Sequence, residues 1–339
     1  MSKRYALGID IGGTKTMVGV FDDALTVRAE VKFRTHAGRG GEAFMKELDN
    51  ALDAALHESK IDAGDIVGVG IGVAGLVSND GSTIVDTPNI PFLTECDLPA
   101  MVATKHLPPP VFANDCQVAL FGEQHAGAAR NARNVIGVFI GTGVGAALII
   151  DGVPYFGSGG IAGNLGRFRV NPMATLAGST RDGYVDDACS RTALASAAAA
   201  LAVRRYAPYL AAHAGSDLAD IRSGDLRDAI AHGDGAVEEL VRSRMHLLGI
   251  VLANLVDLLN PDLIVLGGGV VEAMPDLVRD EVRAALREHA TPAAREHVKV
   301  AVAKLAGHAV TAGAAKLALL HVPESPARRD RRKRTAAAA

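Results

Sequence analysis

Aromatic residues are scarce in this chain. Tryptophan is absent from the 339 residues, and aromatic residues together make up only 4% of them. Hydrophobic residues nevertheless reach 49%, with alanine prominent among them and 37 glycines beside them. Small side chains let backbones approach closely, so this composition favours tight packing of elements over aromatic recognition surfaces.

Cysteine is equally sparse. The three cysteines, Cys96, Cys116 and Cys189, lie far apart, and no Cys-x-x-Cys spacing occurs. This excludes a disulfide framework and a cysteine-based zinc cluster, because both need paired thiols. We expect three reduced thiols and no zinc site.

No strong charge imbalance and no long apolar run is present. The net charge of −3 does not favour nucleic acid. The longest uncharged stretch, residues 134–150, is interrupted by glycines and indicates a hairpin better than a membrane span. A strand pattern from Tyr5 leaves no room for a signal peptide, so we expect a soluble, cytoplasmic protein. The basic run 328–334 is typical of a solvated tail; contact with RNA or anionic lipid is the alternative.

Two glycine turns are the most informative features present. Apolar strand formers flank Gly12-Gly13-Thr14-Lys15, and the same pattern surrounds Gly141-Thr142-Gly143-Val144-Gly145. Both predict β-hairpins, because glycine can take the positive φ that tight turns need. Such turns also bring backbone N–H groups close to an anion. Two in one chain predict a duplicated fold that holds a polyphosphate from both sides.

The other common phosphate-binding patterns are either absent from the sequence or lack the helix that must follow them. No Gly-x-x-x-x-Gly-Lys-Ser/Thr sequence occurs, which excludes a P-loop. Gly70 to Gly75 matches Gly-x-Gly-x-x-Gly, but a turn at Asn79-Asp80-Gly81 follows where a dinucleotide site requires a helix. We interpret this match as accidental.

Two aspartates follow predicted strands. Asp10 lies beside the first glycine turn, where a carboxylate would repel phosphate unless a cation lay between them. With Thr14 and Lys15 adjacent, this favours an Mg²⁺-linked acid over a turn-capping residue. Asp115 lies at a strand-to-helix junction, where it is either a helix N-cap or a general base; spacing alone leaves both open.

Hydrophobic periodicity predicts the main elements. Helices are expected at residues 42–57, 236–259 and 275–289, and across 193–212 with a break at Pro208. Buried strands are expected at residues 65–73 and 263–266. Strand-turn-strand units exclude a purely parallel sheet, so the pattern predicts a mixed sheet with helices on both faces, used twice.

Five short motifs in order resemble the ROK family of sugar kinases, within the actin/hexokinase/heat-shock ATPase superfamily. The resemblance covers residues 5–320. Its motifs are Leu7–Lys15, Thr87–Pro91, Asn114–Asp115, Gly141–Gly145 and Leu266–Gly269, with Gly313–Ala315 near the end. It implies an α/β fold of two ribonuclease-H-like (actin-like ATPase) domains with a cleft between them. The implied domains are residues 1–117, completed by a helix at 309–321, and residues 118–308, before a disordered tail at 322–339.

The resemblance also implies roles for individual residues. Asp115 would be the catalytic base, and Asp10 would hold Mg²⁺ through water. ATP would be held by Gly12, Gly13, Thr14, Lys15, Gly141, Thr142, Gly143, Gly145, Gly267, Gly268 and Gly269. The sugar would be read by Asn89, Asn114, Asp115, Asn164, Arg167 and Asp186. A homodimer is implied as well.

The sequence departs from the family pattern in the sugar pocket. The family usually has Glu-x-Gly-His where this chain has Asn164-Leu-Gly-Arg167, and residues 173–184 lack the family's zinc-binding cysteines. Asn164 must donate as well as accept, and a guanidinium only donates. Arg167 would therefore meet an anionic substrate group, or pair with Asp182, Asp186 or Asp187. These changes predict a zinc-free member with a rebuilt sugar pocket.

The expected function is ATP-dependent phosphorylation of a primary hydroxyl on a hexose or hexose-like polyol. A kinase of an amino sugar or cyclitol is one alternative. A non-catalytic sugar sensor is another, although the related repressors carry an N-terminal helix-turn-helix for which a strand beginning near residue 5 leaves no room.

Overall fold

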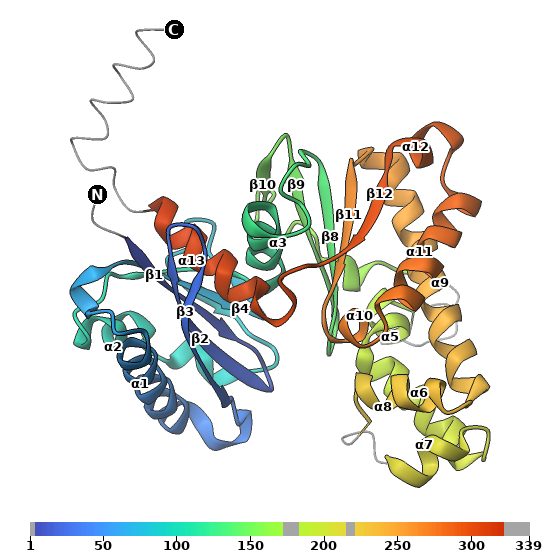
Figure 1. The fold of residues 1–339 in the computed structure, drawn as a ribbon, viewed down its shortest axis with the longest axis horizontal. Coiled ribbons are helices and arrows are strands. Elements are labelled where there is room, and N and C mark those ends of the chain that lie inside the picture. Colours follow the sequence, from blue (N-terminus) through green and yellow to red (C-terminus); the bar gives the residue numbers. More distant parts are fainter. Residues whose placement is uncertain (1–3, 172–182, 215–220, 322–339) are drawn as a thin grey trace, which may run out of the picture. The chain divides into compact units, whose positions relative to one another are not determined.

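The computed structural model describes residues 4–171, 183–214 and 221–321, which group into two compact units (Figure 1). The first unit comprises the residues up to Gly122 together with those from Val310 onward, and the second comprises Glu123–Ala309. Each unit has its own five-stranded mixed sheet and its own hydrophobic core.

The sheet of the first unit has the order β3-β2-β1-β4-β7. Neighbours run antiparallel from β3 to β1 and parallel from β1 to β7. The strands are β1 (Tyr5–Ile11), β2 (Lys15–Asp22), β3 (Val27–Arg34), β4 (Ile66–Val73) and β7 (Pro110–Asn114), with a separate pair β5 (Leu76–Val77) and β6 (Ile84–Asp86). The helices are α1 (Gly40–Ser59), α2 (Leu98–Thr104), α3 (Asp115–Ala126) and α13 (Ala309–His321).

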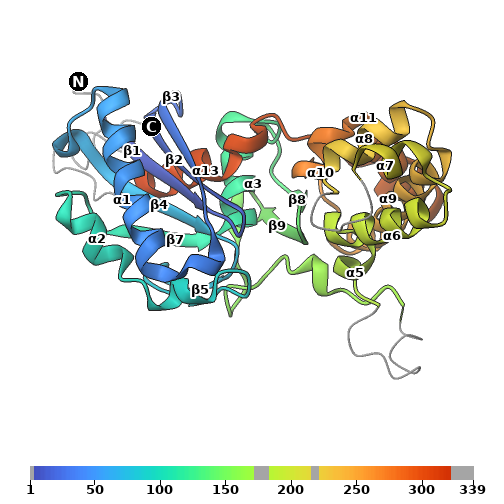
Figure 2. The same cartoon turned by 90° about the horizontal axis from the view of Figure 1, so that it is seen from below.

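The two faces of this sheet are covered in different ways (Figure 2). One face carries branched residues that pack with Phe44, Leu48 and Leu52 of α1. On the other face, β4 presents only glycines, and a Cβ on Gly70 would overlap the backbone of Ala314 in α13. The accidental dinucleotide-like pattern thus has a packing cause: alternate glycines let α13 lie directly on the strand.

The second unit repeats this plan. Its sheet has the order β10-β9-β8-β11-β12, again antiparallel as far as β8 and parallel beyond it. The strands are β8 (Val135–Ile140), β9 (Val144–Ile150), β10 (Val153–Tyr155), β11 (Leu263–Gly267) and β12 (Lys299–Val302). The helices are α5 (Val185–Cys189), α6 (Arg191–Val203), α7 (Pro208–His213), α8 (Ser223–Ala231), α9 (Gly235–Leu259), α10 (Gly269–Ala273), α11 (Pro275–His289) and α12 (Pro292–His297).

The strand register next to the two glycine turns matches between the two sheets. In the first unit the last hairpin pair is Ile11 with Thr16, and in the second it is Ile140 with Val144. One residue earlier, Asp10 pairs with Gly72 of β4, and Phe139 pairs with Gly267 of β11. The predicted duplicated mixed sheet is confirmed, and Phe139 occupies the position equivalent to Asp10.

The predicted helices are confirmed as α1, α9 and α11. The alanine-rich segment forms α6 and α7, which are separated where Pro208 begins the second helix. Within the described residues, no helix combines the length and apolar character that a membrane span requires.

Glu123, which no sequence pattern singled out, is fully buried near the end of α3. Its Oε2 accepts hydrogen bonds from the N–H groups of Ala128 at 2.6 Å and Lys304 at 3.1 Å, and its Oε1 accepts one from Leu305 at 2.7 Å. A buried carboxylate requires such partners. Glu123 therefore ties together the segment by which the chain enters the second unit and the segment by which it leaves.

Candidate functional site

The first glycine turn is braced from β3. The Gly12 N–H donates to the Lys15 carbonyl at 3.0 Å and closes the hairpin. Just past β3, the Thr35 hydroxyl donates to the Gly12 carbonyl at 2.6 Å and lies 2.9 Å from the Thr16 hydroxyl. Gly13, Thr14 and Lys15 are exposed. The hydrogen bonds of Gly12 and Thr35 therefore fix the base of the turn, while its tip and the Lys15 ammonium are exposed and can contact a ligand. The role of Thr35 was not predicted, because the contact spans 23 residues.

Asp10 and Asp115 lie at one edge of the first sheet. The parallel strands β1, β4 and β7 align Asp10 with Gly72 and Gly72 with Ala113, and Asp115 follows two residues later. Burial, and after it the Asp115 charge, raise the pKa of Asp10 to about 7, although the Lys15 ammonium opposes both effects. Burial also raises the pKa of Asp115. Two neighbouring carboxylates that resist ionisation are a donor set suited to a divalent cation.

The capping role at this junction belongs to Asn114. Its Oδ1 accepts from the N–H groups of Cys116 at 3.0 Å and Gln117 at 3.4 Å, and its Nδ2 donates to the Gly75 carbonyl at 3.1 Å. Asp115 is the first residue of α3, and its Oδ1 accepts a hydrogen bond from the N–H of the next residue, Cys116, at 2.8 Å. The helix start thus has an N-cap without Asp115, which weakens the N-cap interpretation of that residue.

Asn89 lies against the first turn. A Cβ built on Gly13 would approach the Asn89 Cβ to 3.4 Å. The loop is fixed by Thr87, whose hydroxyl donates to the Ile90 carbonyl at 2.7 Å. The first unit therefore brings Asn89 next to the turn that follows Asp10.

The second glycine turn is braced by the start of α6. The Gly141 N–H donates to the Gly143 carbonyl at 2.8 Å, and the Arg191 N–H donates to the Gly141 carbonyl at 2.9 Å. The Thr192 hydroxyl donates to the Thr142 carbonyl at 2.9 Å. Both hairpins are confirmed, but the reason given from the sequence is wrong: none of the glycines in either turn has a positive φ. Close approach explains two of them instead: a Cβ on Gly143 would lie 2.9 Å from Asp186, and a Cβ on Gly12 would lie 3.1 Å from the Lys15 carbonyl oxygen.

Asp186 supplies that close approach in the second turn. Its Oδ1 accepts the Val144 N–H at 2.5 Å, and a Cβ on Gly143 would lie 2.9 Å from the same oxygen. Burial raises the pKa of Asp186, and the Val144 N–H and the Arg167 charge oppose the shift. One carboxylate oxygen of Asp186, which the sequence predicted to bind sugar, is thus already used to hold the second glycine turn.

Asn164 precedes the short 3-10 helix η4 (Leu165–Arg167) and Arg167 is its last residue; both side chains are exposed. The Arg167 guanidinium carbon lies 5.2 Å from the centre of the Tyr184 ring. The Arg169 guanidinium contacts the same ring and donates to its hydroxyl at 2.7 Å. The structure therefore places Arg167 against Tyr184 and near the Asp186 charge; Asp182 lies outside the described residues.

The third glycine motif ends β11. Gly268 has a φ of 88°, and a Cβ there would lie 2.6 Å from the backbone of Ile140. Gly269 then begins α10. Gly267 is buried against the Phe139 ring, and only Gly268 and Gly269 reach the surface, beside the second hairpin.

The cysteines are free thiols at Cys96, Cys116 and Cys189. The region where the family carries its zinc cysteines falls mainly on residues 172–182, outside the described residues. Within the described residues, the one group with metal-ligand spacing is His246, Glu288 and His289, far along the chain from the glycine turns.

Comparison with known proteins identifies relatives over almost the whole length. A glucokinase from Streptomyces coelicolor is 31% identical over 317 residues, which cover 92% of this chain and 96% of the relative. An N-acetylgalactosamine kinase from Shewanella sp. (strain ANA-3) is 28% identical over 321 residues, 92% of this chain and 95% of the relative. A xylose repressor from Caldicellulosiruptor bescii is 23% identical over 91% of this chain and 76% of its own length.

A solved structure extends the comparison. The ROK family glucokinase from Streptomyces griseus, crystallised with glucose and AMPPNP, is 30% identical with a TM-score of 0.80, covering 93% of this chain and 99% of that one. The model of the ROK family matches residues 6–320. With its duplicated sheets, its two braced glycine turns and these matches, the chain belongs to the ROK family.

Proposed function

We propose that this chain is an ATP-dependent carbohydrate kinase that transfers the γ-phosphoryl group to a primary hydroxyl of a hexose or hexose-like substrate. The observation that carries the proposal is the first-unit edge, where Asp10, the open Gly12–Lys15 turn and Asp115 come together. The structure of the ROK glucokinase with glucose and AMPPNP supports a sugar as the acceptor and ATP as the donor.

In this proposal Asp115 is the general base. Its carboxylate is half-buried at the strand end, is not required to cap α3, and has a raised pKa. A base with a pKa nearer neutrality accepts a hydroxyl proton more effectively than an ordinary aspartate. Asn114, Asn89, Asn164 and the free oxygen of Asp186 are the proposed partners of the sugar hydroxyls, with Arg167 beside them.

The phosphate side relies on backbone and charge. Lys15 and the N–H groups of Gly12, Gly13 and Thr14 would hold phosphate oxygens, as would those of Gly141, Thr142, Gly143 and Gly145. Mg²⁺–ATP supplies the phosphoryl group and neutralises its charge when bound. Asp10 would orient the metal ion through water, and the backbone of Gly267–Gly269 would accept the nucleoside. Positioning and electrostatics provide most of the catalysis in phosphoryl transfer.

Substrate choice within this class rests on the sugar pocket. Both a glucokinase and an N-acetylgalactosamine kinase are among the relatives, so a hexose and an amino sugar are both candidates. The xylose repressor keeps a non-catalytic sugar sensor as the second candidate function. We expect a homodimer, on the resemblance alone.

A coupled ADP-release assay over a panel of hexoses, amino sugars and cyclitols tests the function. Turnover that needs Mg²⁺–ATP and disappears in Asp115→Asn supports the kinase. Sugar binding by calorimetry with no ADP release for any member of the panel would instead establish the sensor.

A further inference from the structure

The second unit contains a strongly basic cavity away from its glycine turns. It has a volume of about 1030 Å³ and lies among the 127–133 segment after α3, the C-terminal part of α11, α12 and the start of β12. This volume is at the upper end of the range for small-molecule sites. None of the residues assigned above to ATP or sugar lines it.

Cationic side chains dominate the lining. Six of them are exposed to solvent and, among the described residues, form no ion pair with a carboxylate. They are Arg130, Arg283, Arg287, Arg295, Lys299 and Lys304. Several like charges around one concave surface raise the local concentration of anions and repel one another when the cavity holds only water.

Two of the guanidinium groups are held in place by backbone carbonyls. Arg283 donates to the Val300 carbonyl at 2.9 Å, and Arg295 donates to the Arg287 carbonyl. A carbonyl fixes a guanidinium without neutralising it and leaves its other N–H donors available. These arginines are therefore oriented in advance, which lowers the entropy cost of binding an anion.

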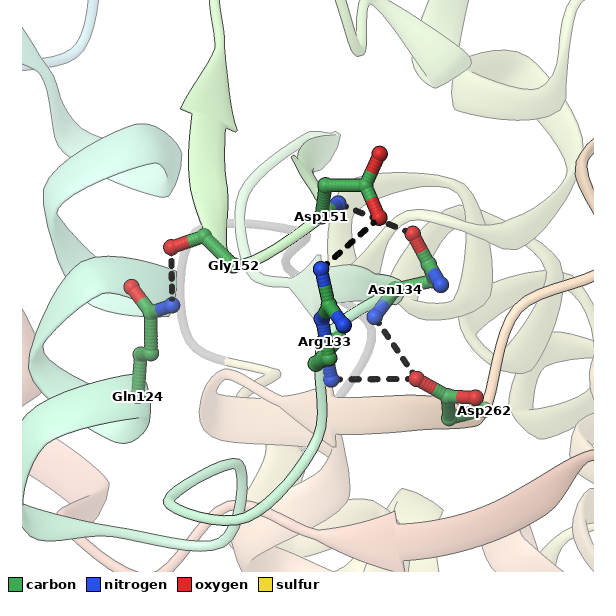
Figure 3. Close-up of polar contacts among 6 residues, drawn as sticks. All are labelled: Gln124, Arg133, Asn134, Asp151, Gly152 and Asp262. Carbon is green, nitrogen blue, oxygen red and sulfur yellow. Dashed lines mark hydrogen bonds and ion pairs between the residues drawn. The ribbon is translucent and has the colours of Figure 1, made fainter.

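The acidic residue in the lining is already used. The Oδ2 atom of Asp262 accepts the N–H groups of Arg133 at 3.0 Å and Asn134 at 2.8 Å (Figure 3). The Arg133 guanidinium turns toward Asp151, 3.3 Å away. Asp262 thus organises the backbone at the cavity edge and does not pair with any of the six cations.

We propose that this cavity binds a small molecule carrying at least two phosphoryl groups, either linked in a chain or separated on one carbon skeleton. Six oriented or flexible cations exceed what a single carboxylate or sulfate would neutralise, and arginine forks match phosphate oxygens bidentately. The concave shape favours a small ligand over a nucleic-acid helix, which needs an extended basic surface.

The position gives such a ligand a route to regulation. Gly127, Ala128 and Lys304 line the cavity, and the N–H groups of Ala128 and Lys304 both bind Glu123. The cavity is therefore built on the two segments that connect the second unit to the rest of the chain.

Titration calorimetry with inorganic tripolyphosphate, without Mg²⁺ or sugar, tests the proposal on the full chain. Orthophosphate, pyrophosphate and fructose 1,6-bisphosphate are compared as further probes. The double variant Arg287→Gln/Lys299→Gln removes two charges whose side chains make no hydrogen bond to any other residue that the structure describes. We expect its Kd for tripolyphosphate to rise at least about tenfold, and orthophosphate to bind far more weakly than the others.

Two controls separate this cavity from other effects. Arg204→Gln/Lys46→Gln removes the same charge from exposed positions elsewhere, and Lys15→Gln perturbs the first phosphate turn. Both should keep the high-affinity event. Equal weakening in the first control would reduce the effect to bulk charge, and loss in Lys15→Gln would assign the binding to the phosphate turns; either result overturns the proposal.

Hydrogen exchange on the unmodified protein covers the case in which the double variant does not fold. Tripolyphosphate should protect amides in residues 283–304, and protection confined to the glycine turns would contradict the proposal. The Kd values of the two probes distinguish the possible ligands. A lower Kd for tripolyphosphate than for fructose 1,6-bisphosphate indicates a phosphate chain, and a lower Kd for fructose 1,6-bisphosphate indicates a bisphosphorylated metabolite. A single-stranded RNA that tripolyphosphate cannot displace from this cavity would overturn the small-molecule assignment.

Discussion

Asn114 and Asp115 are adjacent, but only Asn114 caps α3, in addition to its proposed contact with the sugar, whereas Asp115 is the proposed base. We expect Asp115→Asn to lower kcat by about 10²–10⁴-fold, the usual cost of losing a positioned base, with little change in the melting temperature. Asn114→Ala should instead cost about 1 kcal/mol of folding free energy, because the Cys116 and Gln117 N–H groups lose their acceptor. Steady-state kinetics and thermal unfolding of both variants measure this. Unchanged kcat in Asp115→Asn would remove that residue from the mechanism.

Asp10 makes stability depend on pH in an unusual direction. Its pKa of about 7 exceeds the value of 3.8 for an ordinary aspartate, so between these values the folded protein holds a proton that the unfolded chain releases. The free energy of unfolding therefore falls as pH rises through this window, and the full loss is present above it. We expect Asp10→Asn to stabilise the apo protein by about 4 kcal/mol at pH 8 and by clearly less at pH 5.

Urea unfolding at both pH values measures this difference. The same variant should lose Mg²⁺-dependent turnover, because the amide cannot supply the charge that the carboxylate gives a cation. A stability gain that does not change with pH would contradict the assigned pKa.

Sequence patterns predicted these two aspartates because both lie at the carboxyl ends of strands that meet at one sheet edge: Asp10 in the last residues of β1 and Asp115 directly after β7. They could not predict Thr35 or Glu123. Thr35 contacts a turn 23 residues away, and Glu123 binds backbone more than 180 residues away. Such long-range contacts depend on the tertiary fold and leave no local periodicity. The second role of Asp186 was hidden for the same reason, since its partner Val144 lies 42 residues earlier.

Among the elements, the second hairpin turn offers a direct test of close approach. A methyl group on Gly143 would lie 2.9 Å from Asp186 Oδ1 and displace the acceptor of the Val144 N–H. We expect Gly143→Ala to destabilise the protein by about 1–3 kcal/mol, the cost of an unpaired buried donor, and to raise KM for ATP. Gly159→Ala is the matched control, because nothing lies within 4 Å of its added methyl group. Equal effects of the two variants would show that Asp186 does not brace the turn.

Helices and strands with strong periodicity were predictable, including the long α9 and the break at Pro208. The packing of α13 was not. The glycines of β4 resembled a nucleotide fingerprint in sequence, and only the fold shows that they receive a helix from the end of the chain. Alternate glycines in a strand predict that another group packs closely on it, but the sequence alone does not show whether that group is a helix or a ligand.

For the whole molecule, we expect activity without zinc. Three separated thiols cannot form the four-ligand cysteine site of the family. Elemental analysis should find less than stoichiometric zinc, and a zinc chelator in excess Mg²⁺ should leave turnover unchanged. One tightly held zinc per chain, with activity lost on chelation, would contradict this.

Substrate preference is the second expectation at this level. If Arg167 faces the sugar, a hydroxyl that needs an acceptor there loses its partner, because a guanidinium only donates. We expect some other hexose, amino sugar or cyclitol to exceed glucose in kcat/KM by at least roughly tenfold, about 1.4 kcal/mol of transition-state preference. Arg167→His should reduce the ratio of kcat/KM for the preferred substrate to kcat/KM for glucose. Glucose as the best substrate would make the changes at Asn164 and Arg167 structural, in keeping with the cation–π contact between Arg167 and Tyr184.

The equivalence of Asp10 and Phe139 has a consequence for how a ligand can lie. The two hairpins hold equivalent places in sheets of the same strand order, yet one residue before each last pair the first has a carboxylate and the second a benzyl ring. That single difference makes the two hairpins chemically unequal. A metal ion beside the first hairpin would meet an anionic side chain, whereas one beside the second would meet an apolar ring, so the two turns cannot exchange roles in holding a metal-bound phosphate.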